Sequence, residues 1–314
     1  MKPRLSRDWA SESPYDRFFD FIAPEADRFG ILLEHIQNLG LNSVVISIEG
    51  NRHFFIFPQG IDIKNFSGGA FPFRGQSPVV LTAHYDRVAG SPGANDNSAA
   101  VFQLLKAALR LSAPPQAGGA GKWMVIFTDK EELKKGEGFQ EQGSYSLAKK
   151  LRGWGLANAL VFNFDACGTG DTFVFSNTAA YLLEKNSRPG FQRASRAAGS
   201  LQGKALAAAR QLRLGKVLSA PTPFSDDAGF LRGGIPAQTV TMLPTEEAAP
   251  FASLLRNRPG FADLLISGSV NKTADRHLVP ETWRCLNGPS DSHLRLTPEH
   301  YRGIVRFMVE LCGG

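Results

Sequence analysis

Short apolar runs and longer amphipathic stretches take turns along most of the chain. The apolar runs predict buried strands, at residues 79–83, 123–128, 159–164 and 237–242. Further strands are predicted on either side of the turn at 49–51 and later in the chain, at residues 41–48, 53–57, 171–175 and from Val217. Apolar residues at spacings of three and four predict helices, at residues 13–40, 99–111, 144–151, 179–184, 192–214, 245–267 and 298–311.

This order of elements predicts an α/β protein. Strands that alternate with helices form a mixed or mostly parallel sheet that is covered on both faces. The 314 residues allow one large domain of this kind or two small ones, and 43% hydrophobic residues suffice for a substantial core. The sequence shows no internal repeat and no sign of a second domain, so a single domain over residues 1–314 is expected.

Polar residues collect where the predicted strands end. The run at 79–83 leads to His84 and Asp86. These two side chains can converge, because residues two apart on an extended chain face the same way. Asp96 follows a loop rich in Gly and Pro, at the point where the chain enters a helix. A position of this kind, beside a strand end, is where ligands bind in open α/β sheets.

Two more of the predicted strands end in acids. The run at 123–128 is followed by Glu131 and Glu132, and the run at 159–164 by Asp165. Packing does not require acids at the ends of apolar strands, and like charges close together are costly unless a cation offsets them. A histidine and several carboxylates suit a divalent metal such as zinc.

Each of these residues also has an ordinary interpretation. Taken alone, His84 fits a strand end and Asp96 fits a helix N-cap. The pair Glu131 and Glu132 alone fits a solvated loop. The combination favours the metal site, in which Asp86 orients the His84 ring and fixes its tautomer.

Five motifs in a fixed order resemble a known family. They are HYD at 84–86, PGANDN at 92–97, DKEE at 129–132, NFD at 163–165, and FSDDAGF with GIPA at 224–230 and 234–237. The combination resembles the co-catalytic zinc exopeptidases related to aminopeptidase Y and the bacterial leucyl aminopeptidases, which also include the glutaminyl cyclases. The resemblance runs from about Pro78 to the C-terminus. It implies a three-layer α/β/α sandwich with a mixed, mostly parallel sheet of about eight strands, in one zinc exopeptidase-like catalytic domain.

The resemblance also implies roles for the candidate residues. Asp96 matches an acid that bridges two metals. His84 and Asp165 match the remaining ligands of one metal, and Glu132 matches a ligand of the other. Glu131 matches the general base, which takes a proton from water and passes it to the leaving amine.

Two further features belong to the same resemblance. It implies a cis peptide between Asp96 and Asn97. Asp226 matches an acid near the catalytic glutamate, and Asp227 stands where the family usually has a histidine. Either acid can instead cap the helix that runs to Leu231, and for Asp227 capping is the preferred interpretation.

The last ligand of the family is missing from its expected place. The family ends its ligand set with a histidine in a pattern like His-Thr-Pro-x-Asp-Thr, and the corresponding stretch here begins at Asn287. A neutral amide is a poor zinc ligand beside imidazole. One well-bound zinc ion and a doubtful second site are therefore expected. His293 and His277 are the nearest alternatives, although surface positions are expected for both, as for His53 in the hairpin.

The resemblance first implies hydrolysis of an N-terminal peptide bond or a related amide bond, with a small peptide or amide as substrate. The alternatives are glutaminyl cyclisation on the same fold and a non-catalytic binding protein with a degenerate metal site. The formal net charge of +6 comes without a nucleic-acid motif, so nucleic acid is not expected as a partner. The oligomeric state stays open.

Cysteine usage and hydropathy bear on the location. Cys167, Cys285 and Cys312 form no CxxC pair, which is typical of a reducing compartment. The N-terminal residues lack the apolar segment of a signal peptide, and no run approaches the ~18–20 apolar residues of a membrane span. A cytoplasmic protein without membrane contact is therefore expected.

Overall fold

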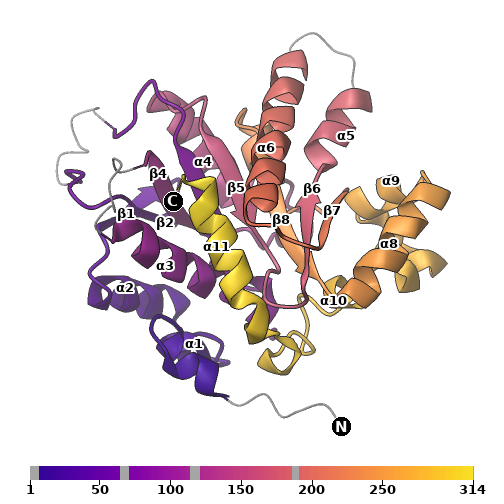
Figure 1. Ribbon diagram of the computed structural model, residues 1–314, viewed down its shortest axis with the longest axis horizontal. Helices are drawn as coiled ribbons and strands as arrows, with labels where there is room; N and C mark the ends of the chain where they lie inside the picture. Colours follow the sequence, from indigo (N-terminus) through magenta and orange to yellow (C-terminus); the bar gives the residue numbers. More distant parts are fainter. Residues whose placement is uncertain (1–6, 64–70, 114–120, 186–190, 314) are drawn as a thin grey trace.

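The computed structural model describes residues 7–63, 71–113, 121–185 and 191–313, which form an eight-stranded sheet with helices around it (Figure 1). The order across the sheet is β1-β2-β4-β3-β5-β8-β6-β7. The strands are β1 (Ser43–Ile48), β2 (Asn51–Ile56), β3 (Val79–His84), β4 (Trp123–Thr128), β5 (Leu160–Phe164), β6 (Thr172–Ser176), β7 (Val217–Ala220) and β8 (Ala237–Leu243). The predicted mixed sheet of about eight strands is confirmed.

Four strands in the middle of the sheet run in the same direction. β4, β3, β5 and β8 pair in parallel, whereas β2 meets β4 and β6 meets β8 in antiparallel fashion. These four strands are buried along nearly their whole length, as parallel strands covered on both faces are. Their carboxyl ends therefore meet at one edge of the sheet.

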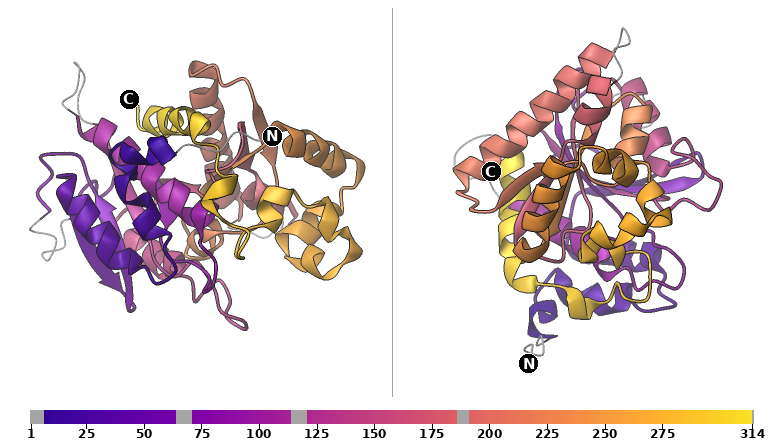
Figure 2. Two further views of the ribbon diagram at one scale, coloured as in Figure 1. Left: turned by 90° about the horizontal axis from the view of Figure 1, so that it is seen from below. Right: turned by 90° about the vertical axis from the view of Figure 1, so that its right-hand side faces the viewer.

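Helices stand on both sides of the sheet (Figure 2), so the three-layer α/β/α arrangement is confirmed. α3, α6 and α11 lie side by side on one face, and α4 and α7 pack together on the other. No helix of the described residues has the length and apolar character that crossing a membrane requires. The helices are α1 (Phe18–Phe21), α2 (Arg28–Asn38), α3 (Ala99–Ser112), α4 (Gly143–Gly153), α5 (Thr178–Lys185), α6 (Phe191–Gln211), α7 (Asp226–Arg232), α8 (Thr245–Asn257), α9 (Phe261–Ile266), α10 (Glu281–Arg284) and α11 (Tyr301–Leu311).

Alternation along β3 supplies apolar side chains to both layers of the core. Leu81 and Ala83 pack into the cluster beneath α3 and α11. Val80 packs into the cluster on the opposite face, together with Leu147 of α4 and Phe230 of α7. Successive side chains of a strand point to opposite faces of the sheet. Because both faces of β3 are buried, β3 belongs at the centre of the sheet.

The connections after β3 and β4 run to opposite faces of the sheet. β3 continues into α3 on one face, whereas β4 continues into α4 on the other. When the connections of two neighbouring strands run to opposite faces, a crevice forms beyond the carboxyl ends of those strands. Ligands of open α/β sheets bind in such a crevice. The fold therefore provides a binding position where His84 ends β3.

A third apolar cluster lies beyond β7, around α8, α9 and α10 at the right of Figure 1. It is built around Phe251, Phe261 and Trp283, each of which is largely buried. This part of the chain adjoins the carboxyl-end edge of the sheet, and its residues reappear in the wall of the cavity described below.

The helix predicted over residues 13–40 is interrupted. α1 ends at Phe21, and α2 begins only at Arg28. Pro24 lies between them and cannot continue a helix without losing a backbone hydrogen bond. Asp27 then starts α2 as its N-cap, accepting a hydrogen bond from the backbone N–H of Gly30 at 3.0 Å.

Candidate metal centre

His84, the last residue of β3, is fully buried where the parallel strands end. Its Nε2 is 3.0 Å from Asp96 Oδ1 and 3.9 Å from Asp165 Oδ1. On the other side of the ring, Nδ1 is 3.3 Å from Asp86 Oδ1. One nitrogen thus faces two acids, while the other is held by a carboxylate, which is the usual surrounding of a metal-binding histidine.

Asp86 joins the end of β3 to the turn after β4. Its two oxygens accept hydrogen bonds from the backbone N–H groups of Glu131, at 3.1 Å, and Glu132, at 3.0 Å. Burial opposes ionisation of Asp86, but the contact with His84 and these two hydrogen bonds outweigh it and lower its pKa. The ionised carboxylate therefore fixes His84 and the glutamate pair relative to each other.

Two groups of side chains with metal-binding atoms share His84. One group is His84 with Asp96 and Asp165, and the other is His84 with Glu131 and Glu132. Within each group, one side-chain atom of each residue lies within 4.8 Å of the others. The structure thus brings together residues from three strand ends that the sequence indicated separately.

The loop that carries Asp96 is held by Asp291 from outside the central strands. Asp291 is buried, and it accepts hydrogen bonds from the backbone N–H groups of Asn95, at 2.8 Å, and Asp96, at 3.1 Å. Burial raises the pKa of Asp291 to about 7, although these two hydrogen bonds act in the opposite direction. Asp291 belongs to the C-terminal stretch that resembles the family's last ligand motif.

Asn97 ties the same loop to the end of β5. The peptide between Asp96 and Asn97 is cis, which confirms that implication of the sequence. The Asn97 amide donates a hydrogen bond to the carbonyl of Phe164, at 2.9 Å, and accepts one from the backbone N–H of Ala166, at 3.3 Å. These two residues flank Asp165, so a single side chain sets the spacing of the two acids.

Burial shifts the pKa values of several ionisable groups in the site. Burial, reinforced by the charge of Asp165, raises the pKa of Asp96. Burial, reinforced by Asp96, raises the pKa of Glu132 to about 8. Burial works against a charge on His84, but its contacts with the acids outweigh this and raise its pKa well above the usual value. A divalent cation among these groups favours the ionised acids and the neutral imidazole.

The chemistry of the donor atoms fits a divalent metal. His84 Nε2, Asp165 Oδ1 and Glu132 Oε1 are buried, and within the described residues they make close contacts at most and no hydrogen bond of regular geometry. Buried polar atoms are nearly always paired with protein, water or an ion. Imidazole nitrogen and carboxylate oxygen are the donors that zinc accepts together.

Glu131 and Glu132 differ in their surroundings. Glu131 lines the cavity at the site, and its Oε1 accepts a hydrogen bond from the Gln142 amide at 3.2 Å. The same amide donates to the Glu131 carbonyl at 3.3 Å. Both glutamates belong to the group of potential metal-binding atoms with His84, but only Glu131 also lines the cavity. Glu131 is therefore the glutamate of the pair that a molecule in the cavity can reach.

The two acids at the start of α7 are both buried. Asp226 accepts a hydrogen bond from the Thr128 hydroxyl at the end of β4, and burial raises its pKa to about 6. Asp227 accepts a hydrogen bond from the backbone N–H of Ser225, the residue before α7, at 3.0 Å. The N-cap of α7 is Ser225, and Asp227 lies in the first turn of the helix instead of capping it. Asp226 stands close enough to Glu131 to raise the pKa of that group.

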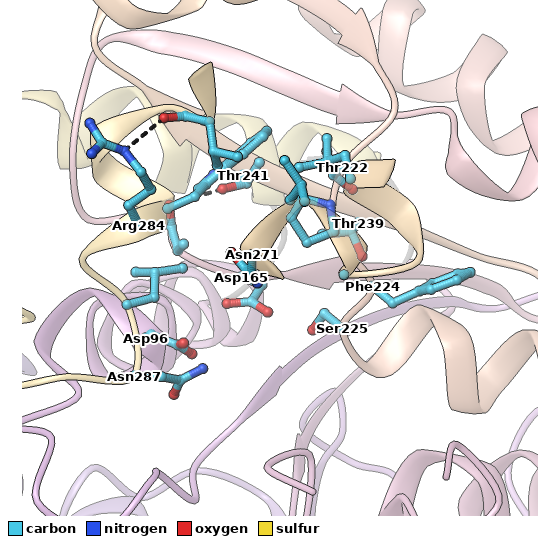
Figure 3. A pocket seen from close by; sticks show the side chains of 18 of the residues that line it. Asp96, Asp165, Thr222, Phe224, Ser225, Thr239, Thr241, Asn271, Arg284 and Asn287 are labelled. Carbon is cyan, nitrogen blue, oxygen red and sulfur yellow. Dashed lines mark hydrogen bonds between the residues drawn. The ribbon is translucent and has the colours of Figure 1, made fainter. Parts of the chain in front are cut away.

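A cavity of about 340 Å³ opens at this edge of the sheet (Figure 3). Asp96, Glu131 and Asp165 line it together with Asn287, which lies beside Asp96 in the figure. The rest of its wall comes mainly from hydroxyl-bearing and apolar side chains, among them Thr222, Thr239, Thr241, Leu265, Val270 and Trp283.

The position of the missing histidine is occupied by Asn287. It has a φ of 61°, a left-handed conformation that asparagine tolerates better than most residues. His277 is exposed, whereas His293 is half-buried and packs edge-on against Phe19 with ring centroids 5.2 Å apart. Neither histidine joins the two groups of metal-binding atoms found in the described residues.

The sequence model of peptidase family M28 matches residues 68–259, which is more than half of the chain. The chain belongs to peptidase family M28. This confirms the resemblance to zinc exopeptidases that the five motifs indicated. No curated protein sequence matches this M28 chain.

Solved structures with the same fold include a zinc aminopeptidase from Bacillus subtilis, at 19% identity and a TM-score of 0.51. That match covers 83% of this chain and 49% of the aminopeptidase, so the chain spans about half the length of that protein. The glutaminyl cyclase of Porphyromonas gingivalis is 14% identical, with a TM-score of 0.61 and 98% coverage of both chains. The LapA aminopeptidase of Legionella pneumophila is 13% identical, with a TM-score of 0.57, 98% coverage of this chain and 70% of that protein.

The surface position predicted for His53 is wrong. His53 is fully buried in this M28 chain, because β2 is not an edge strand but pairs with β4 on its inner side. Its Nδ1 accepts a hydrogen bond from the backbone N–H of Asp129 at 3.3 Å, just before the glutamate pair. Burial lowers the pKa of His53 to about 4, so a neutral ring supports the turn after β4.

The sequence also gave no indication of Arg28, which holds the other side of the site. Its guanidinium is buried and donates to six acceptors from α1 to the start of α3: the carbonyls of Phe21, Tyr85, Asp86, Pro92 and Gly93 and the hydroxyl of Ser98. Burial lowers its pKa to about 9. No local pattern marks such a residue, because its partners lie far from it along the chain.

Replacing Arg28 with Met is expected to lower the free energy of unfolding by about 3–5 kcal/mol, since several buried carbonyls lose their donor at once. Urea unfolding measures the effect. The matched control is Arg17→Met, which removes a partly exposed arginine paired with Asp20 and Glu34 and should cost no more than about 1 kcal/mol. Equal effects of the two substitutions would contradict the role of Arg28.

Proposed function

We propose that this M28 chain is a zinc-dependent hydrolase that removes the N-terminal residue from small peptides or related amides. The observation that carries the proposal is the meeting of His84, Asp96 and Asp165 with Glu131 at one cavity. Membership of a peptidase family supports the reaction class. The description of the Bacillus subtilis relative as a zinc aminopeptidase supports the metal and the bond.

His84, Asp96 and Asp165 would hold the tightly bound zinc ion. Bound zinc supplies a Lewis acid, which polarises a carbonyl and makes water easier to deprotonate. Asp86 keeps Nε2 of His84 directed at the two acids. Asn97 fixes the distance between those acids, so the chain itself sets the geometry into which the ion fits.

Glu131 is the general base in this proposal. Its carboxylate takes a proton from the attacking water and delivers it to the nitrogen of the leaving amine. Two observations favour Glu131 over Glu132: it lines the cavity, and Gln142 holds its carboxylate in place. Glu132 would serve as a ligand of a second metal.

That second position is weak in this proposal. It would be formed by Asp96 and Glu132 with Asn287, whose amide oxygen is neutral and binds zinc poorly beside imidazole and carboxylate ligands. Asn287 lies beside Asp96 in the cavity wall, where a better ligand would complete the site (Figure 3). One well-bound zinc ion per chain is therefore proposed.

Replacing Asn287 with His is expected to create a second tight zinc site. Calorimetric titration of the metal-free protein should give about one tight equivalent for the native sequence and about two for Asn287→His. The matched control is Asn271→His, which adds a histidine to another part of the cavity wall and should leave one tight equivalent. Two tight sites of similar affinity in the native protein would contradict the proposal.

The proposed function is tested by incubating the zinc-loaded protein with short peptides and following their products. Release of the N-terminal amino acid is expected. Release of ammonia from peptides with N-terminal glutamine would instead favour a glutaminyl cyclase, a possibility supported by the full-length match to the Porphyromonas gingivalis cyclase fold. Zinc binding without either product would favour the non-catalytic alternative.

We also propose that residues 1–314 form a single catalytic domain and that the protein is cytoplasmic. The three cysteines are free thiols, as in proteins of reducing compartments.

A further inference from the structure

The cavity at the metal centre has two chemically different parts. Asp96, Glu131 and Asp165 contribute acids on one side. Arg276 and Arg284, from the segment around α10, line the same cavity, and Arg284 lies well apart from Asp96 and Asp165 in Figure 3. A molecule in this cavity therefore meets acids at the donor cluster and the Arg284 side chain away from them.

The acids closest to these two arginines in the sequence are already engaged elsewhere. Asp275 forms two hydrogen bonds with Arg258, at 3.2 and 3.0 Å. Glu281 forms an ion pair with Arg295 at 2.6 Å. Among the described residues, no acid forms an ion pair with Arg276 or Arg284.

Arg284 is anchored in a way that leaves most of its donors available. Its Nε donates to the carbonyl of Val279 at 2.9 Å, drawn as a dashed line in Figure 3. This bond fixes the guanidinium against the chain. Within the part of the chain that the structure describes, its terminal N–H groups make no other hydrogen bond and can donate to a ligand. A guanidinium is suited to a carboxylate, because two of its N–H groups match the two oxygens.

The apolar part of the cavity wall is suited to an aliphatic stem. Leu265, Val270 and Val279 lie in the cavity lining, and the apolar cluster beyond β7 supports them. The volume of about 340 Å³ lies at the lower end of the range for small-molecule sites. A short molecule with an amine at one end and an anion at the other matches this arrangement.

We propose that Arg276 and Arg284 bind a carboxylate of the substrate, so that the preferred substrates are short peptides with an acidic group. This inference rests on the proposed hydrolase function and specifies its substrate class. The carboxylate has two sources of the same chemistry. It is either the side chain of an N-terminal Glu or Asp, or the C-terminal carboxylate of a dipeptide.

Calorimetric binding to the zinc-loaded protein tests the proposal without turnover. The probes are dipeptides in which a CH2–NH group replaces the scissile amide. Ala-Ala is compared with its C-terminal amide, and Glu-Ala amide is compared with Gln-Ala amide. The variants are Arg276→Gln/Arg284→Gln and the control Arg302→Gln, an exposed arginine of α11 outside the cavity lining.

In one of the two pairs, the probe with the carboxylate is expected to bind about tenfold to a hundredfold more tightly than the probe with an amide in its place. The pair that shows the preference identifies the source of the carboxylate. The preference should persist in Arg302→Gln and fall to about threefold or less in the double variant. Equal binding within both pairs, no detectable binding of any probe, or a preference that survives in the double variant would overturn the proposal.

Hydrolysis assays with the cleavable peptides separate this inference from the function on which it rests. A carboxylate preference in binding, without release of amino acids from any peptide, would leave the arginine site standing and refute the hydrolase. Release of amino acids with no carboxylate preference in binding would support the hydrolase and refute the arginine site.

Discussion

Glu131→Gln is expected to lower kcat for peptide hydrolysis by about a hundredfold to ten-thousandfold, the usual contribution of a general base. The amide cannot accept the proton of water, yet it has nearly the shape of the carboxylate and can keep the hydrogen bond partner Gln142. Zinc content should stay at the native level, because Glu131 is not a ligand in this account. Activity assays and elemental analysis of the same preparation measure both effects.

Glu132→Gln is the matched comparison, since it makes the same chemical change one residue away. It should leave the tightly bound zinc ion in place and weaken only the second, poorly occupied position. Glu299→Gln changes an exposed glutamate and should alter neither the activity nor the zinc content. Loss of activity from Glu132→Gln together with retained activity in Glu131→Gln would show that the roles of the two glutamates are exchanged.

His84→Ala is expected to remove tight zinc binding altogether. The substitution deletes the imidazole that faces Asp96 and Asp165 and leaves only their carboxylates. A ligand present at about a hundred times its Kd stabilises the native protein by about 2.7 kcal/mol. Thermal or urea unfolding with added zinc should show this gain for the native protein and less than about 1 kcal/mol for the variant, and hydrolysis should fall to background.

His35→Ala is the control for the loss of a buried histidine. His35 is nearly inaccessible on α2, and its Nε2 lies 2.6 Å from the carbonyl of Pro14, away from the central strand ends. This variant should lose stability in the metal-free state but keep the full gain from zinc. An equal gain in His84→Ala would mean that zinc binds elsewhere.

The sequence is most informative where metal-binding or catalytic side chains follow directly after a buried strand. His84, Glu131 and Asp165 could be placed together because the carboxyl ends of parallel strands meet at one edge of a sheet. Alternating strands and helices also sufficed for the layers of the fold. The cis peptide at Asp96 came from the resemblance of the PGANDN motif and from no local pattern.

Residues that support the site from a distance could not be predicted. Arg28 lies 57 positions before Tyr85, one of its acceptors, and nothing near Arg28 in the sequence marks that partnership. The burial of His53 is equally hidden, because a single histidine in a hairpin does not reveal that its strand pairs on both sides. The same limit applies to the cavity wall, where Arg284 and Asp96 line one cavity only through the folding of α8 to α10 beyond β7.

Anomalous diffraction at the zinc edge, from crystals soaked in zinc, shows whether His84, Asp96 and Asp165 hold a catalytic zinc ion as we propose. We expect one strong peak within about 2.0–2.2 Å of His84 Nε2 and of one oxygen from each acid, with a second, weaker peak at most beside Glu132. If no peak lies between these three side chains, or if the strong peak lies only elsewhere in the molecule, the proposed zinc site is wrong.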